Sequence, residues 1–85
     1  MDMQKEEENS FVRLIWDFRG PDGLKTAEHH AIHLREFFEK EGLKELKVDC
    51  STPSELHSTA FAEVPMERMI EFRDVLKPNR GEYVE

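Results

Sequence analysis

The sequence predicts an α+β domain, and three patterns lead to that prediction. Residues 11–18 alternate between two kinds of side chain, which is typical of a strand with one face on a core. Residues 27–41 and 65–77 repeat apolar side chains at helical spacing. Two shorter alternating segments, 44–52 and 57–64, lie between these helices. The expected order is strand, helix, strand, strand, helix.

The first strand lies in the segment SFVRLIWDFRG. Successive side chains of an extended chain point to opposite faces, so the two sides can be read separately. The core side is wholly apolar and comprises Val12, Leu14, Trp16 and Phe18. The opposite side is mixed and comprises Phe11, Arg13, Ile15 and Asp17. Gly20, Pro21 and Gly23 then end the strand.

The first helix is predicted between a polar cap and a glycine. Thr26 is a candidate N-cap, while Asp22 would give an earlier start, and Gly42 is the expected C′ residue. The apolar stripe comprises Ala27, Ala31, Leu34, Phe37 and Phe38. This stripe should pack on the apolar side of the first strand.

The remaining elements follow from shorter patterns. The expected core residues of the second and third strands are Leu46, Val48, Cys50, Ala60, Ala62 and Val64. Pro65 suits the first turn of the second helix, which should stop at Lys77, before Pro78. Its predicted stripe comprises Met66, Met69, Ile70, Arg73 and Leu76, with Phe72 on the flank. Residues 81–85 are expected to add a short edge strand.

This element order resembles the ferredoxin-like β-α-β-β-α(-β) two-layer sandwich over residues 10–85. The resemblance implies an antiparallel sheet with two helices on one face and with the first and third strands in the centre. It implies no activity, because this fold hosts many functions. In pattern the chain also looks like the dimeric α+β barrel superfamily, which includes YciI-like proteins. That resemblance implies a homodimer paired sheet to sheet and, for an enzyme, a histidine–aspartate pair.

Composition restricts the classes of partner. The net charge is −7, and no run of lysine or arginine offsets it, so nucleic acid is not an expected partner. No segment is apolar enough to span a bilayer, and the start of the chain lacks a secretory pattern. The single cysteine excludes an internal disulfide and a multi-cysteine zinc site, so we expect a cytoplasmic protein without a cofactor. Residues 1–9 are interpreted as a disordered acidic tail.

Two helices can cover only one face of the predicted sheet. The bare face should present Ile15 and Phe61 near its centre, with Phe11 beside them. Proteins often cover an apolar patch with a partner, so these three residues are the candidate interface. The alternative is that scattered apolar groups on a solvated sheet need no partner.

Three of the four histidines fall in the segment AEHHAIHLREFF. His30 lies on the inward stripe and is expected to be buried and hydrogen-bonded to a neighbour. His29 and His33 are four residues apart near the polar side, where they can bind one transition metal or remain a solvated pair. The zincin pattern H-E-x-x-H is absent, because His30 follows the first histidine.

The sequence suggests two further candidate sites, one for an anion and one for acid/base catalysis. Arg19, Gly20 and Gly23 precede a helix N-terminus and are a candidate anion site, the alternative being a tight turn. Asp17 is the candidate acid/base partner of His30 or His33.

No nucleophile, metal cluster or cofactor motif stands out from the rest of the sequence. We therefore expect a non-catalytic domain that acts by self-association, or by binding a small molecule or protein, on the open face of the sheet. The alternatives are a small YciI-like enzyme and a weak metal-binding module. The ligand and the reaction, if there is one, are not specified by the sequence.

Overall fold

The computed structural model describes residues 10–84 and confirms an α+β domain of the predicted order. The elements are β1 (Phe11–Arg19), α2 (Gly23–Lys40), β2 (Val48–Ser54), β3 (His57–Pro65), a 3₁₀ turn (Met66–Arg68), α3 (Met69–Leu76) and β4 (Arg80–Val84). The four strands form one antiparallel sheet in the order β2-β3-β1-β4, so β1 and β3 are central as predicted. The predicted acidic tail at 1–9 lies outside the described residues.

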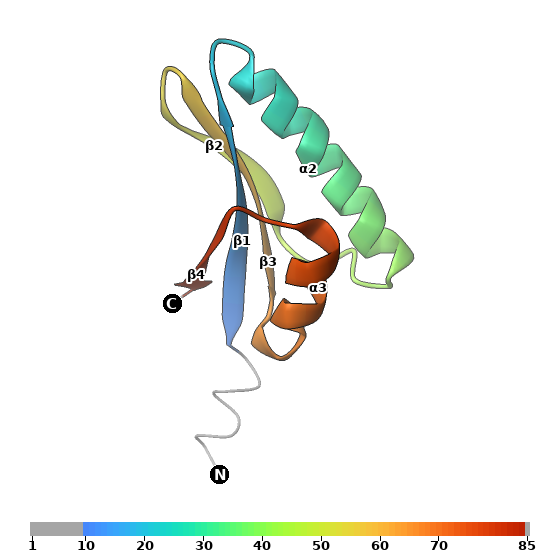
Figure 1. Cartoon of the computed structure of the whole chain (residues 1–85). Coiled ribbons are helices and arrows are strands. Elements are labelled where there is room, and N and C mark those ends of the chain that lie inside the picture. Colours follow the sequence, from blue (N-terminus) through green and yellow to red (C-terminus); the bar gives the residue numbers. More distant parts are fainter. Residues whose placement is uncertain (1–9, 85) are drawn as a thin grey trace.

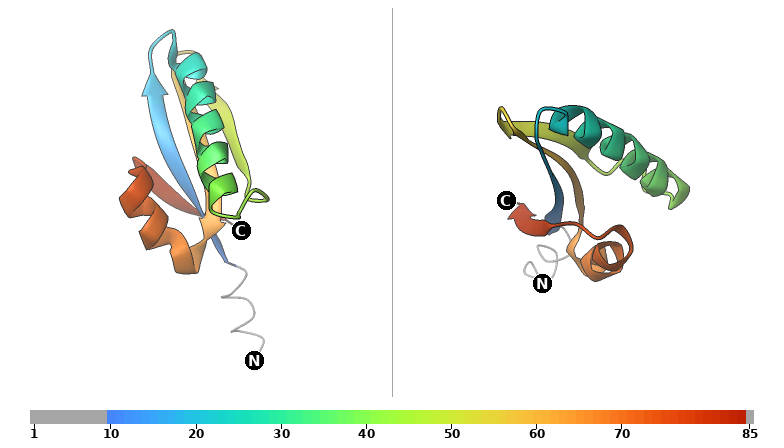
Figure 2. Two further views of the ribbon diagram at one scale, coloured as in Figure 1. Left: turned by 90° about the vertical axis from the view of Figure 1, so that its right-hand side faces the viewer. Right: turned by 45° about the horizontal axis from the view of Figure 1, so that its top comes forward.

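The molecule has two layers, with both helices on the same face of the sheet (Figures 1 and 2). The long helix α2 packs against β3, β2 and β1, and the shorter α3 lies toward the β4 side. The indole N–H of Trp16 in β1 donates to the carbonyl of Leu76 at 2.9 Å, which ties the end of α3 to the sheet. This architecture is consistent with a ferredoxin-like fold. Among residues 10–84 no helix is long and apolar enough to cross a membrane.

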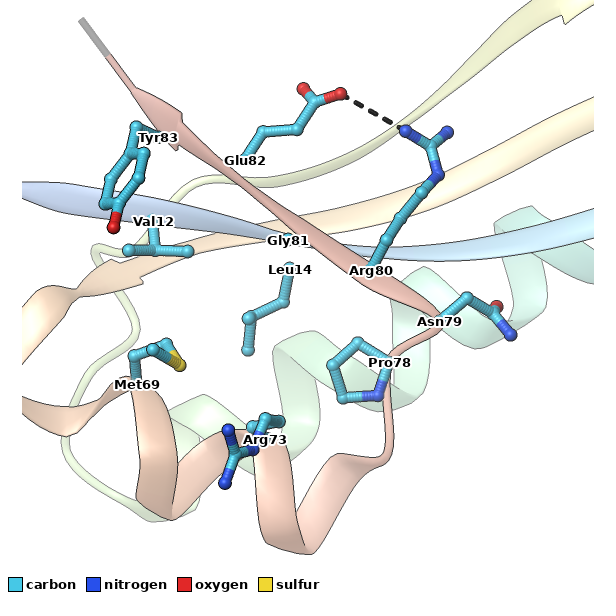
Figure 3. A pocket seen from close by; sticks show the side chains of 10 residues that line it. All are labelled: Val12, Leu14, Met69, Arg73, Pro78, Asn79, Arg80, Gly81, Glu82 and Tyr83. Atoms are coloured by element: carbon cyan, nitrogen blue, oxygen red, sulfur yellow. Dashed lines mark hydrogen bonds and ion pairs between the residues drawn. The ribbon is translucent and has the colours of Figure 1, made fainter.

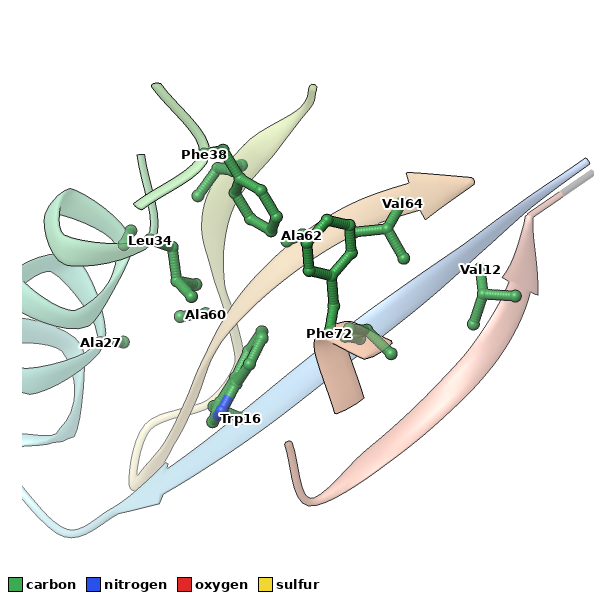
Figure 4. Close-up of a cluster of buried hydrophobic side chains, with 12 residues drawn as sticks. Val12, Trp16, Ala27, Leu34, Phe38, Ala60, Ala62, Val64 and Phe72 are labelled. Carbon is green, nitrogen blue, oxygen red and sulfur yellow. The ribbon is translucent and has the colours of Figure 1, made fainter. Parts of the chain in front are cut away.

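The core lies between the sheet and the helices (Figure 4). The apolar side of β1 is buried as predicted, since Val12, Leu14 and Trp16 are 6%, 2% and 5% exposed. Alanine side chains in α2 and β3 allow the helix to approach the sheet closely. These alanines, all fully or almost fully buried, are Ala27, Ala31, Ala60 and Ala62.

The first helix begins earlier than a Thr26 cap would place it. α2 starts at Gly23 with Asp22 as N-cap, and the Thr26 hydroxyl instead donates to the Asp22 carbonyl. Its C-terminus agrees with the prediction, because Gly42 has a φ of +79°. The amide of Leu43 donates to the Phe38 carbonyl at 2.7 Å, as in a Schellman motif.

The predicted stripe of the second helix is correct at Met66, Met69 and Leu76, which pack against the core, and wrong at Ile70 and Arg73, which are exposed. Ile70 is 58% exposed, whereas Phe72 is fully buried. The segment begins with a 3₁₀ turn, which has about three residues per turn. The residues that face the sheet after this turn therefore differ from those expected for an α-helix throughout. β2 also differs from the prediction: it begins at Val48, and its pairing with β3 is irregular between Ser51 and Ser54.

Candidate functional site

The face of the sheet without helices is covered by long polar side chains. Ile15 and Phe61 are directly paired in the register of β1 and β3. They are only 5% and 9% exposed. The guanidinium carbon of Arg13 lies 4.6 Å from the centre of the Phe61 ring, and Nζ of Lys47 lies 5.9 Å from it. The apolar patch expected at Phe11, Ile15 and Phe61 is therefore mostly covered at Ile15 and Phe61, even in the single chain.

The charged groups of this face are paired with one another, across strands and along β4. Nη2 of Arg13 lies 2.6 Å from a carboxylate oxygen of Glu63, which is its partner in the register of β1 and β3. On β4, Nη1 of Arg80 donates to Glu82 at 3.2 Å. Covering this face with an apolar surface would remove these ion pairs from water, which is costly.

A cluster of three charged or titratable groups lies at one end of the open face. Nε2 of His57 is 2.7 Å from Oδ1 of Asp17. Arg80 donates to both carboxylate oxygens of Asp17, at 3.1 Å and 3.2 Å. The backbone N–H of Asp17 donates to the side-chain oxygen of Asn79 at 2.8 Å. Asp17 therefore links β1, β3 and the start of β4.

Strand pairing explains why these residues meet. β1 and β3 pair Asp17 with Thr59 and Arg19 with His57. His57 is thus diagonal to Asp17 on the same face, within reach of a long side chain. The side chains of Asp17 and His57 are 16% and 15% exposed, so the pair is largely shielded from solvent.

Arg80 and then His57 lower the pKa of Asp17 from 3.8 to about 2. The carboxylate is therefore ionised at neutral pH. Its position beside the imidazole orients the ring of His57.

A cavity of about 170 Å³ opens on the same face. Its lining comprises Arg13, Ile15, Ser51, Pro53, Thr59, Phe61, Arg80 and Glu82. The hydroxyls of Ser51 and Thr59 lie 2.7 Å apart. Arg80 belongs both to the cavity lining and to the cluster around Asp17. The cavity therefore presents guanidinium, hydroxyl and carboxylate groups above an apolar floor.

Asp17 is not brought together with the histidines of α2. The ring centroid of His30 lies 5.0 Å from Trp16 and 5.6 Å from Phe18, both on the helix side of the sheet. His33 lies on the exposed side of α2 beside His29. The alternation along β1 separates these groups, because Asp17 points to the opposite face from its neighbours Trp16 and Phe18.

His30 packs as an inward residue, but without the hydrogen bond that was expected. Its Nε2 is buried and has no hydrogen-bond partner within the described part of the chain. Burial, and to a smaller extent the charge of His33, lowers the pKa of His30. The ring is therefore neutral at neutral pH and acts as part of the aromatic packing.

The glycines of the loop after β1 have packing roles in the structure. Gly20, at φ +99°, donates its amide to the Leu56 carbonyl at 2.9 Å. The Gly23 amide donates to the Gly20 carbonyl at 3.1 Å. A Cβ at Gly23 would lie 2.9 Å from the Phe18 carbonyl oxygen. Both amides are used within the protein, so an anion at Arg19, Gly20 and Gly23 would have to displace these bonds.

A second cavity, of about 310 Å³, lies on the helix side between α3 and β4 (Figure 3). Val12 and Leu14 lie in its interior, with Met69 of α3 and Tyr83 of β4 beside them. Arg80 and Glu82 point away from it, toward the open face. The cavity is mainly apolar and lacks the convergent polar groups of the open-face site.

The sequence argument missed the roles of His57 and Arg80. His57 alternates with Thr59 and Phe61 and so shares their face, but its pairing with Asp17 depends on the strand register. Arg80 lies in a strand whose pairing with β1 could not be assigned from the sequence. Comparisons with protein-family models, curated proteins and solved structures found no match.

Replacing Asp17 with asparagine should destabilise the protein at neutral pH and much less in acid. In the folded state Asp17 stays ionised down to a pKa of about 2, against 3.8 for the ordinary value. Its contribution is therefore complete above about pH 5, falls as the pH drops through 3.8, and is mostly lost near pH 2. The shift corresponds to at most about 2.4 kcal/mol, and because Arg80 is 44% exposed, solvent screening of its charge reduces our expectation to about 1 kcal/mol.

Urea denaturation of wild type and Asp17→Asn at pH 7 and at pH 2 measures this difference. Asp74→Asn is the matched control, because it makes the same chemical change at a side chain that is 64% exposed. A stability gap for Asp17→Asn that is equally large at both pH values would show that charge is not its cause.

Proposed function

We propose that this chain is a non-catalytic binding domain that holds a small polar molecule in the open-face cavity. The observation that supports the proposal is the convergence of Arg13, Arg80 and Glu82 around the floor formed by Ile15 and Phe61. Ligand sites typically combine a few fixed polar groups with an apolar lining. Ion pairs to Glu63 and Asp17 hold the two guanidinium groups in place before a ligand arrives.

The size and charge of the cavity define the class of ligand. A volume of about 170 Å³ matches five or six water molecules, at about 30 Å³ each. The lining holds the guanidinium groups of Arg13 and Arg80 and the carboxylate of Glu82. Arg13 is paired with Glu63, and Arg80 is paired with Glu82 and Asp17. A simple anion therefore meets two guanidinium groups that are already paired with three carboxylates. A molecule with both an acceptor and a donor, such as an amide or a small zwitterion, fits better.

Titration of ¹⁵N-labelled protein with acetamide, glycine and acetate tests the proposal. We expect acetamide or glycine to shift the amides of Ile15, Thr59 and Phe61, with acetate weaker. Arg80→Gln should weaken these shifts several-fold, because it removes a donor from the lining. Arg19→Gln makes the same change outside the cavity and should leave them unaltered. Shifts that are absent, or that survive Arg80→Gln, would refute the proposal.

Self-association on this face is the competing form of the proposal. Sedimentation across a range of protein concentrations distinguishes the two, because ligand binding to a monomer leaves the mass unchanged. If dimer formation broadens the NMR signals of the same open-face amides, the partner bound on this face is a second copy of the chain and not a small ligand. The paired charges that cover Ile15 and Phe61 favour the ligand.

A second candidate function is proton transfer, and the His57–Asp17 contact of 2.7 Å is the observation that favours it. In this role His57 is the base, Asp17 orients its ring, and Arg80 connects the pair with the cavity. In D₂O the protein would then speed the loss of carbon-bound protons next to the carbonyl of small keto acids. Equal rates for wild type and His57→Gln would remove this candidate and leave the binding proposal unaffected.

A further inference from the structure

The exposed side of α2 carries two imidazole rings whose nitrogens converge. Nε2 of His29 and Nε2 of His33 lie 3.2 Å apart, and the two ring centroids lie 4.7 Å apart. One helical turn separates the residues, so the backbone of α2 itself sets this spacing. The side chain of His33 is 61% exposed, which leaves the pair open to an ion from solvent.

The distance between the two nitrogens fits a shared metal ion. Imidazole nitrogens bind zinc at about 2.0–2.1 Å, so two ligands lie about 2.9 Å apart at a right angle and about 3.3 Å apart at the tetrahedral angle. The 3.2 Å separation of the two Nε2 atoms falls within this range. An ion can therefore replace the proton that the two rings share, with only small rotations of the rings.

A carboxylate on the same helix lies beside the second ring nitrogen of His33. Nδ1 of His33 lies 3.4 Å from Oε1 of Glu36. Nδ1 of His33 thus faces a carboxylate, while Nε2 of the same ring faces His29. Carboxylates commonly orient metal-binding histidines in this way.

We propose that His29 and His33 bind one divalent transition-metal ion on the surface of α2, with Glu36 positioning the second ligand. Imidazole suits Zn²⁺, Ni²⁺ and Cu²⁺, and Cu²⁺ should bind most tightly. Within residues 10–84 no group of three or more His, Cys, Asp or Glu side chains is arranged to hold a metal ion. Two protein nitrogens therefore hold the ion, and water fills the remaining positions. The site is separate from the open-face cavity.

The test is a titration of the full chain with ZnCl₂ or NiCl₂, followed by NMR of the histidine rings. The ring signals of His29 and His33 should shift or broaden at one ion per chain. Those of His30 and His57 should not, because one is buried among aromatic rings and the other is bound to Asp17. His33→Gln should weaken binding at least tenfold.

The control variant H33Q/E36H keeps four histidines but separates the second from His29 by seven residues. That is about 10.5 Å along the helix axis, which is too far for one ion. It should therefore bind as weakly as His33→Gln. Equal affinity of wild type and this variant, or ring shifts confined to other histidines, would overturn the assignment, and circular dichroism would verify that each variant is folded.

Discussion

Replacing Phe72 with alanine should lower the free energy of unfolding by about 3–5 kcal/mol. The side chain is fully buried, and its ring makes edge-to-face contacts with Phe37 and Phe38 at centroid distances of 5.9 Å and 5.2 Å. The Arg68 guanidinium lies over the same ring at 4.7 Å. Small domains have a total stability of only about 5–15 kcal/mol, so this variant should melt at a much lower temperature.

Ile70→Ala is the matched control on the same helix. Ile70 is 58% exposed, so its truncation should change stability by about 0.5 kcal/mol or less. Thermal denaturation followed by circular dichroism compares both variants with wild type. A larger loss for Ile70→Ala than for Phe72→Ala would mean that α3 presents the opposite side to the sheet.

Replacing Gly23 with alanine should lower the free energy of unfolding by about 1–3 kcal/mol, as overpacking does. The new Cβ would lie 2.9 Å from the carbonyl oxygen of Phe18 and 3.3 Å from its carbonyl carbon. Both atoms belong to the backbone, so α2 or the end of β1 has to move.

Leu24→Ala is the comparison for this variant, since Leu24 is the next residue and is 43% exposed. Urea denaturation should show a clearly smaller effect for it. Backbone amide shifts of Gly23→Ala should spread to Phe18 and Ser58, which surround the glycine. Unchanged stability and unchanged shifts at these residues would contradict a packing role for Gly23.

The fold could be predicted because its central strand has a clear pattern. Val12, Leu14 and Trp16 form a wholly apolar side opposite a mixed one, and the structure buries all three. The phase of α3 could not be predicted, because local hydrogen bonding decides whether residues 66–68 form a 3₁₀ or an α-helical turn. Because the segment begins with a 3₁₀ turn, Phe72 lies at the centre of the contact between α3 and the sheet, not at its flank.

The candidate site could be predicted only as far as the face on which it lies. Asp17 alternates with Ile15 and His57 alternates with Phe61, which gives their shared face, but their contact needs the register of β1 against β3. The sequence could also not predict that Arg13 covers Phe61, because this contact depends on the direction in which a long side chain extends. The i, i+4 contact of His29 with His33 was predictable, since a single helix sets it.

The two outer strands of the sheet differ from its regular centre, and this affects how molecules can aggregate. β2 contains Pro53, which has no N–H to donate, close to the irregular pairing between Ser51 and Ser54. β4 is only five residues long and carries Arg80 and Glu82. Proline, local irregularity, short length and charge all discourage a neighbouring molecule from adding its own strand to an edge. These features of β2 and β4 disfavour edge-to-edge growth of the sheet.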